Sequence, residues 1–248
     1  MAAMLIAISS ADGFGQVNIE RQRRSLDSDG IAGEAAFSLM VNSGNSESVR
    51  GDAGSGLVIK SGPNLGFAIL AFSLGEKSSQ RFINKGMGHL RYNYIWGERS
   101  SWELFFQTEY NEFTLLKNRS LAGTGFRYDL VKTEKRAAVF GTGIMGEREA
   151  LDRGFNLRDQ SGTNLRSSSY LTFSMVLGKT TEWGNVVYFQ PSMDDFDDYR
   201  SLADSNLSFS VSGRFSFIVS MNLRYDSKPP EGIKKADLEI KNGMSVNF

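Results

Sequence analysis

Apolar and polar residues alternate along most of the chain after residue 33. In the segment SWELFFQTEYNEF, Trp102, Leu104 and Phe106 share one face of an extended chain. Glu103 and Gln107 share the opposite face. Because successive side chains of a β-strand point to opposite faces, a period of two predicts half-buried strands. No segment sustains the i, i+3, i+4 spacing of an amphipathic helix, so the chain is predicted to be all-β.

Twelve segments are predicted to be strands, although segment 47–60 is rich in glycine and segment 65–75 is apolar on both faces. Tight connections separate the strands at one end. Examples are SGPN, GERS and KTEK, whereas connections at the other end, such as DDFDDYRSLAD and SKPPEGIKK, are on average longer. This sorting, with an even strand number, is typical of bacterial outer-membrane barrels. The prediction is a closed antiparallel up-and-down transmembrane β-barrel of about 12 strands. The segments lie near residues 33–43, 47–60, 65–75, 82–96, 101–113, 118–131, 136–148, 165–178, 185–194, 205–212, 214–226 and 235–248.

Composition excludes several other classes of protein. No apolar run approaches the roughly 18 residues that a transmembrane helix needs. The 28 basic and 28 acidic residues give a net charge of zero, which argues against a nucleic-acid partner. The chain has no cysteine, so disulfides and thiolate metal sites are excluded. We expect no cofactor.

The beginning of the chain is predicted to form no strand of the barrel. The segment MLIAISSADGFG has a short apolar core followed by small residues, as at the end of a secretory signal, but no basic region precedes it. Residues 1–15 are interpreted as a truncated signal peptide, with a plain leader as the alternative. The charged segment ERQRRSLDSDG predicts a flexible leader over residues 16–32. Residues 33–248 then form the barrel.

Aromatic residues gather near the end with the short turns. Trp96, Trp102 and Trp183 fall at or beside these turns, and Tyr92 and Tyr94 lie one step inside. Indole and phenol rings favour the interface of a bilayer, where the ring is half buried and its polar atom stays hydrated. The pattern predicts an aromatic girdle on the periplasmic side.

The last strand is predicted to pair with the first, because an open edge invites aggregation. Its end, Asn242-Gly243-x-x-Val246-x-Phe248, resembles the C-terminal signal that the outer-membrane assembly machinery recognises. That signal combines a polar residue, a glycine, a hydrophobic residue and a terminal aromatic. The alternative is a soluble β-domain that happens to end in VNF.

Three segments resemble the salt-induced outer-membrane protein family (domain-of-unknown-function family 481). They are SLMVNSGNSES, FFQTEYNEFTLLKNRSLAGTGFRYDLVKTEK and LRYDSKPPEGIKKADLEIKNGMSVNF, and the stretch from Tyr225 to Lys235 is the most distinctive. The resemblance implies an outer-membrane β-barrel. The function of the family is not established, so the resemblance supplies no catalytic residues.

His89 is the single histidine, and it is the candidate base of an enzyme. Outer-membrane barrels that act on lipid generally use a histidine beside a serine or aspartate. Met87 and Arg91 occupy the same-face positions on its strand, so a nucleophile would have to come from a neighbouring strand. We expect a hydrogen-bonded polar residue in the lumen and no enzymatic activity. The alternative is a lipid-acting barrel enzyme with His89 as base.

Charged residues of both signs are predicted to line the lumen. A lumen of one sign would indicate an ion-selective channel, whereas mixed charges form ion pairs that fill the interior. The acidic loop Asp194, Asp195, Asp197 and Asp198 is a candidate cation site, although a solvated external loop is the simpler interpretation. The predicted lumen residues are Glu34, Arg91, Glu103, Glu109, Arg119, Arg127, Asp129, Arg224, Asp226, Glu239 and Lys241.

These patterns favour a monomeric, non-enzymatic barrel of the bacterial outer membrane. It would either pass small solutes through a narrow lumen or serve the envelope structurally, for example under osmotic or salt stress. Its expected partners are membrane lipid, lipopolysaccharide and the outer-membrane assembly machinery. A soluble, lipocalin-like binder is the third hypothesis.

Overall fold

The computed structural model describes residues 29–44, 47–151, 160–212 and 215–246. These residues form one twelve-stranded sheet in which each strand pairs antiparallel with the next along the chain. The all-β antiparallel prediction and the strand number are therefore confirmed. The strands are β1 (Gly30–Asn42), β2 (Ser48–Ser61), β3 (Asn64–Lys77), β4 (Gln80–Ile95), β5 (Ser100–Asn111), β6 (Leu116–Lys132), β7 (Arg136–Leu151), β8 (Gln160–Val176), β9 (Thr181–Pro191), β10 (Tyr199–Ser210), β11 (Phe215–Asp226) and β12 (Ala236–Val246). One short 3-10 helix, η1 (Glu112–Thr114), joins β5 to β6.

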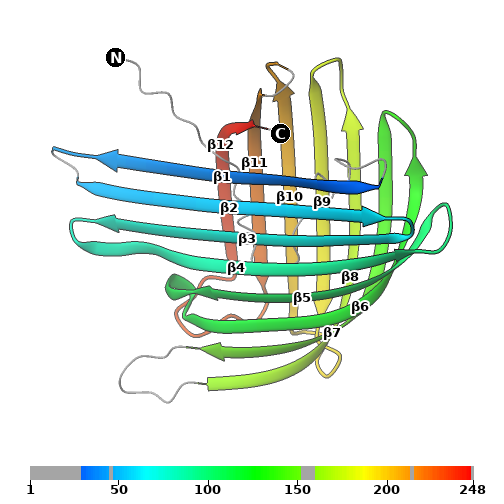
Figure 1. Ribbon diagram of the computed structural model, residues 1–248. Helices are drawn as coiled ribbons and strands as arrows, with labels where there is room; N and C mark the ends of the chain where they lie inside the picture. Colours follow the sequence, from blue (N-terminus) through cyan, green and yellow to red (C-terminus); the bar gives the residue numbers. More distant parts are fainter. Residues whose placement is uncertain (1–28, 45–46, 152–159, 213–214, 247–248) are drawn as a thin grey trace.

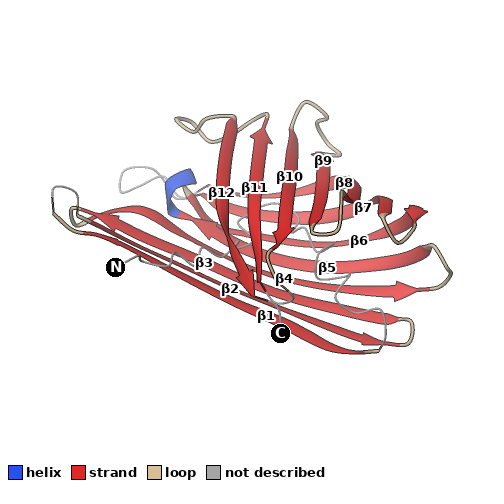
Figure 2. Cartoon of the chain, turned by 90° about the horizontal axis from the view of Figure 1, so that it is seen from above, coloured by secondary structure: helices blue, strands red, loops and turns tan. Residues whose placement is uncertain are grey.

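The sheet coils into an open half-barrel. In Figure 1 the first four strands run across the view, β9–β12 run up and down it, and β5–β8 turn the sheet from one direction to the other. Figure 2 shows the same opening from above. Within the described residues β1 and β12 do not pair, so the expected closure is not formed there. The part of the chain that the structure describes contains no helix long and apolar enough to cross a membrane.

The alternation of the sequence becomes an inner and an outer face. On β5, Glu103, Phe105 and Gln107 are buried on the concave side, while Leu104 and Phe106 are exposed on the convex side. Strand β4 shows the same inversion of the usual soluble pattern, with His89 and Arg91 buried and Leu90 exposed, whereas β3 is apolar on both faces. Three clusters of buried apolar side chains form the core of the concave side, on β2–β4, on β5–β7 and on β7–β10.

Several connections differ from the expected ones. The segment EKSSQ, expected to contain a longer loop, is a two-residue turn in which Ser78 and Ser79 have φ values of 49° and 62°. Positive φ at both positions matches the twist of paired strands, which allows so tight a turn. Strand β10 begins at Tyr199, six residues before the predicted start, and β1 begins at Gly30, inside the predicted leader.

Candidate functional site

The concave face carries an ion-pair network centred on Glu147 of β7. Arg119 Nε of β6 donates to Glu147 Oε1 at 2.8 Å, and Arg166 Nε of β8 donates to Glu147 Oε2 at 2.5 Å. Arg200 of β10 donates to the same carboxylate through Nη1. Arg200 lies three strands from β7 in the sheet, so this contact crosses the hollow of the half-barrel.

The arginines extend the network in three directions. Arg119 Nη1 donates to Glu109 Oε1 at 3.0 Å. Arg200 donates to Glu149 Oε2 at 2.7 Å through Nη2 and to Asp226 Oδ2 at 2.8 Å through Nε. Arg166 donates to both oxygens of Asp198, at 2.9 and 3.1 Å. The network therefore joins strands from β5 to β11 and fixes the loop after β9.

A second polar cluster lies between β4, β5 and β8. Tyr170 Oη donates to Glu103 Oε2 at 2.8 Å, and Asn93 Nδ2 donates to Glu103 Oε1 at 2.6 Å. Arg91 Nη1 lies 3.5 Å from Glu103 Oε2. Since β5 and β8 are not neighbours, the Tyr170 side chain reaches across the concave face and packs beside Tyr188. Side chains thus meet across the hollow at two levels.

His89 lies on the concave side, fully buried, and has no catalytic partner among the described residues. Its Nδ1 lies 3.0 Å from Gln107 Oε1, and its ring is stacked on Phe105. Its Nε2 has no hydrogen-bond partner among the described residues. A histidine acting as base would need a nucleophile within hydrogen-bond reach, and none lies there in the described part of the chain.

The structure places the predicted lumen residues at different depths. Arg91, Glu103, Glu109, Arg119 and Arg127 are buried on the concave side. Their partly exposed companions are Asp129, Arg224, Asp226 and Glu239. The side chains of Glu34 and Lys241 lie outside the described part of the structure.

The sequence interpretation missed Glu147, Arg166 and Arg200. Glu147 is in phase with the buried Met145, and Arg166 is in phase with the buried Ser168, so the alternation contained a signal for both. Arg200 lies in a segment that was expected to be a loop, and in a loop the alternation of inward and outward side chains does not apply. Its role depends on partners more than 50 residues away in the sequence.

The acidic loop does not gather its carboxylates into a metal site. Asp198 is bound by Arg166, and Asp195 accepts from Nζ of Lys228 in the loop after β11. Among the described residues there is no group of three or more histidine, cysteine, aspartate or glutamate side chains placed to hold a metal. The hydrogen bond from Lys228 lowers the pKa of Asp195, and the same bond raises the pKa of Lys228.

The predicted girdle residues lie at the short-turn end. Tyr92, Tyr94, Trp96 and Trp102 are exposed on the convex side, and Trp183 is partly exposed with its Nε1 donating to Ser205 Oγ at 3.1 Å. In the predicted assembly signal, Asn242, Gly243 and Val246 belong to β12. Phe248 lies outside the described residues.

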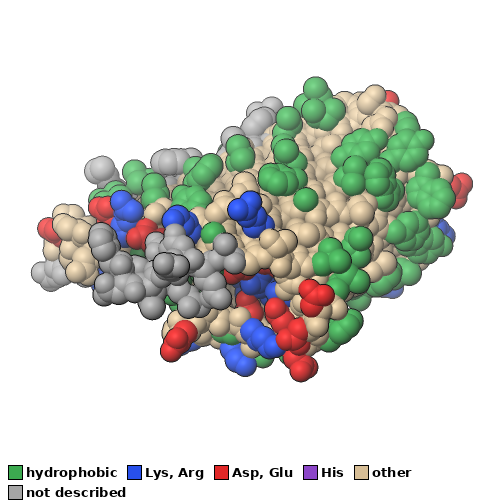
Figure 3. Space-filling view, turned by 90° about the horizontal axis from the view of Figure 1, so that it is seen from below, with side chains coloured by type: hydrophobic (Ala, Val, Ile, Leu, Met, Phe, Trp, Pro, Cys, Tyr) green, Lys and Arg blue, Asp and Glu red, His purple; other side chains and the backbone are tan. Residues whose placement is uncertain are grey.

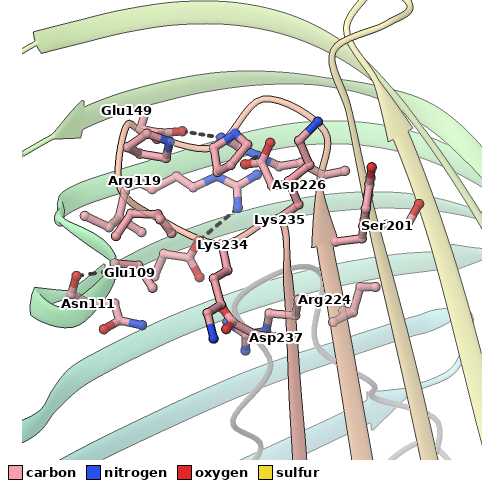
Figure 4. Close-up of a pocket in the computed structure, with 18 of the residues that line it drawn as sticks. Glu109, Asn111, Arg119, Glu149, Ser201, Arg224, Asp226, Lys234, Lys235 and Asp237 are labelled. Carbon is pink, nitrogen blue, oxygen red and sulfur yellow. Dashed lines mark hydrogen bonds and ion pairs between the residues drawn. The ribbon is translucent and has the colours of Figure 1, made fainter.

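A cavity of about 120 Å³ opens at the opposite end, under the loop between β11 and β12 (Figure 4). Its walls include Glu109, Arg119 and Arg200 of the network. Pro229 and Pro230 of the loop also line it. The distinctive stretch from Tyr225 to Lys235 therefore contributes to this cavity.

Comparison with known proteins gives one family and a shared fold. A family model described as "Protein of unknown function, DUF481" matches residues 35–248. No curated protein matches the sequence. The fold is similar to that of the NanC porin in a rhombohedral crystal form, with a TM-score of 0.51, 8% identity, and coverage of 88% of this chain and 99% of that chain. The translocator domain of the autotransporter NalP from Neisseria meningitidis gives a TM-score of 0.48 at 12% identity, with 93% of each chain covered.

Proposed function

The chain belongs to the DUF481 family of proteins of unknown function, and from this premise we propose that it is a non-enzymatic outer-membrane β-barrel with an occluded interior. The observation that carries the proposal is the meeting of side chains across the concave face. Tyr170 reaches Glu103 at one level, and Arg200 reaches Glu147 at another. A wide aqueous pore needs a clear path at both levels, so we expect a structural or surface-binding role.

The outer face supports insertion into a membrane. Leu90, Phe106, Leu171 and Val187 are exposed on the convex side of their strands. Figure 3 shows hydrophobic side chains over the right-hand part of the surface in view, and charged side chains gathered mainly at the lower centre. The strands contain 11–17 residues, which is enough for the roughly 9–11 that cross a bilayer.

We also propose that β1 and β12 pair in the membrane and close the barrel. Backbone groups on a lipid-exposed edge have no water to bond, which makes an open sheet costly in a bilayer. With twelve strands, β1 and β12 run in opposite directions and are suited to antiparallel pairing. In this form the protein would be a monomer in contact with lipid and lipopolysaccharide, delivered by the outer-membrane assembly machinery. A role under salt stress stays a prediction.

Conductance of the refolded protein in a planar bilayer tests the occlusion. We expect no steps of porin size, either with the full chain or after removal of residues 1–28. The double variant Tyr170→Ala with Arg200→Ala removes the side chains that cross the concave face at both levels, and it is expected to produce discrete steps. Tyr128→Ala, on the convex side, is the matched control and should stay silent. Large steps from the wild-type protein would contradict an occluded interior.

Two assays separate the alternative functions. Purified protein is expected not to hydrolyse phospholipid, whereas hydrolysis that His89→Ala abolishes would establish a barrel enzyme. On a denaturing gel, unboiled and boiled samples of a membrane barrel should migrate differently. Identical migration, together with recovery in the soluble fraction, would favour a soluble binder.

A further inference from the structure

The loop between β11 and β12 forms a defined roof over the cavity at the long-loop end. Ile233 N donates to Pro230 O at 3.0 Å, and Gly232 has a φ of 85°, a left-handed conformation that suits glycine. Ser227 Oγ donates to the carbonyl oxygen of Asp197 at 2.8 Å, which ties the loop to its neighbour. Proline also fixes the backbone, so the roof is ordered before any ligand arrives.

The acidic side chains that line the cavity are already engaged. Glu109 accepts from Arg119, and both Glu149 and Asp226 accept from Arg200. Asp237 lies directly opposite Arg224 in the pairing of β11 with β12. The cavity therefore has little carboxylate capacity left for a cation.

Hydrogen-bond donors, in contrast, remain unused. Arg119 is held through Nε and Nη1, which leaves Nη2 buried without a partner in the described part of the chain. Gln190 Nε2 is also buried with no partner among the residues that the structure describes, and both Arg119 and Gln190 line the cavity. Leaving a buried donor unpaired is costly, so two in one cavity indicate a missing acceptor. Arg200 shows the contrast, because all three of its guanidinium nitrogens have partners.

Cationic side chains also line the cavity. Lys234 and Lys235 line the cavity and form no ion pair with any described residue (Figure 4). Arg224 adds a third cationic side chain to the wall. We propose that the cavity binds a small carboxylate anion, whose two oxygens would accept from Arg119 Nη2 and Gln190 Nε2 while the lysines supply charge. This inference goes beyond the proposed function, since it needs the fold but not an occluded interior.

The proposal is tested by saturation-transfer NMR of the full chain in detergent micelles, with succinate as the probe at constant ionic strength. We expect saturable binding. Gln190→Leu removes one unpaired donor at similar volume and should raise the Kd roughly tenfold, the effect of losing one hydrogen bond to a charged group. Thr172→Val is the matched control, because it removes another buried, unpartnered polar atom that does not line the cavity. Its Kd should equal that of the wild-type protein.

The exposed lysines give an independent variant that does not touch the core. Lys234→Gln combined with Lys235→Gln should weaken succinate binding, whereas Lys179→Gln, in the turn before β9, should not. Absence of saturable succinate binding by the wild-type protein would overturn the proposal. So would succinate binding that both Gln190→Leu and the double lysine variant leave unchanged. Saturable binding of inorganic phosphate without binding of succinate would show that the carboxylate assignment is wrong.

Discussion

At the scale of the residue, Glu147 is the carboxylate on which the concave face depends most. It accepts from Arg119, Arg166 and Arg200 while its side chain is buried. Glu147→Gln keeps the size but removes the charge, which leaves three guanidinium groups short of a partner. Removing one partner of a buried ion pair costs about 3–5 kcal/mol, so we expect a loss of unfolding free energy in this range. Urea titration of the protein folded into lipid vesicles measures it.

The control for this change is an exposed carboxylate at the other end of the sheet. Glu134 lies in the turn between β6 and β7 and is exposed. Glu134→Gln should alter the unfolding free energy by less than about 0.5 kcal/mol. Equal small effects at Glu134 and Glu147 would show that the network does not stabilise the fold.

The pair of Asp195 and Lys228 gives a prediction for pH dependence. The hydrogen bond from Lys228 lowers the pKa of Asp195. Stability from a lowered carboxyl pKa is present above the ordinary pKa of the group, and is lost as the pH falls through the lowered value. Lys228→Met should therefore raise the pH at the midpoint of the Asp195 titration. Carbon-13 NMR of the Asp195 carboxyl group measures this midpoint. Lys234→Met, on the same loop, should not move it, and an unchanged midpoint in Lys228→Met would refute the pairing.

At the scale of the element, β10 shows what alternation can and cannot reveal. Tyr199 and Ser201 continue the outward phase of this strand, and Arg200 and Leu202 continue the inward phase. The segment was nonetheless expected to be a loop, because charged residues beside an acidic stretch resemble a solvated surface. The partners of Arg200 lie on β7 and β11, and they meet it only once the sheet has formed.

The same reasoning explains which other features of the fold could be predicted from the sequence. Most of the strands carry apolar and polar alternation, a local property that can be read from the sequence, whereas β3 is apolar on both faces. The cavity could not, since it depends on how the loop after β11 folds over Glu109 and Arg119. The tight turn at Ser78 and Ser79 was also missed, because serine is not the usual residue for two positive φ angles.

The pairing of β6 with β7 predicts an effect of a single methyl group. Gly125 and Gly143 face each other in register, and a Cβ atom on Gly143 would lie 2.2 Å from the carbonyl oxygen of Thr124. Backbone must move to admit it, so Gly143→Ala should lower the unfolding free energy by about 1–3 kcal/mol. Gly184→Ala on β9 meets nothing within 4 Å and should be neutral or slightly stabilising. Urea titration that gave equal stability for the two variants would rule out the close approach.

At the scale of the whole molecule, the arrangement reverses that of a soluble protein. Charged side chains such as Glu147 and Arg166 are buried on the concave side, and large apolar ones such as Leu171 and Phe189 are exposed on the convex side. In water the apolar surface would promote aggregation. In a bilayer it contacts acyl chains, and the ion pairs are kept inside, away from lipid. The two edges of the sheet, β1 and β12, are unpaired in the described structure, and they would expose backbone groups to lipid.

Closure of the barrel can be tested by crosslinking, because the chain has no cysteine of its own. Ile240 of β12 is exposed, and so are Leu39 and Val41 of β1. A cysteine at Ile240 can therefore be combined with a cysteine at Leu39 or at Val41. If the two strands pair in the membrane, Ile240→Cys should form a disulfide with Leu39→Cys or Val41→Cys, since a disulfide needs Cα atoms within about 7 Å. The crosslink should appear after folding into vesicles and not in urea. Pairing of Ile240→Cys with Phe140→Cys, exposed on the distant β7, is the negative control. If neither cysteine pair across β1 and β12 forms a disulfide, and pairs at the neighbouring positions also form none, the sheet stays open.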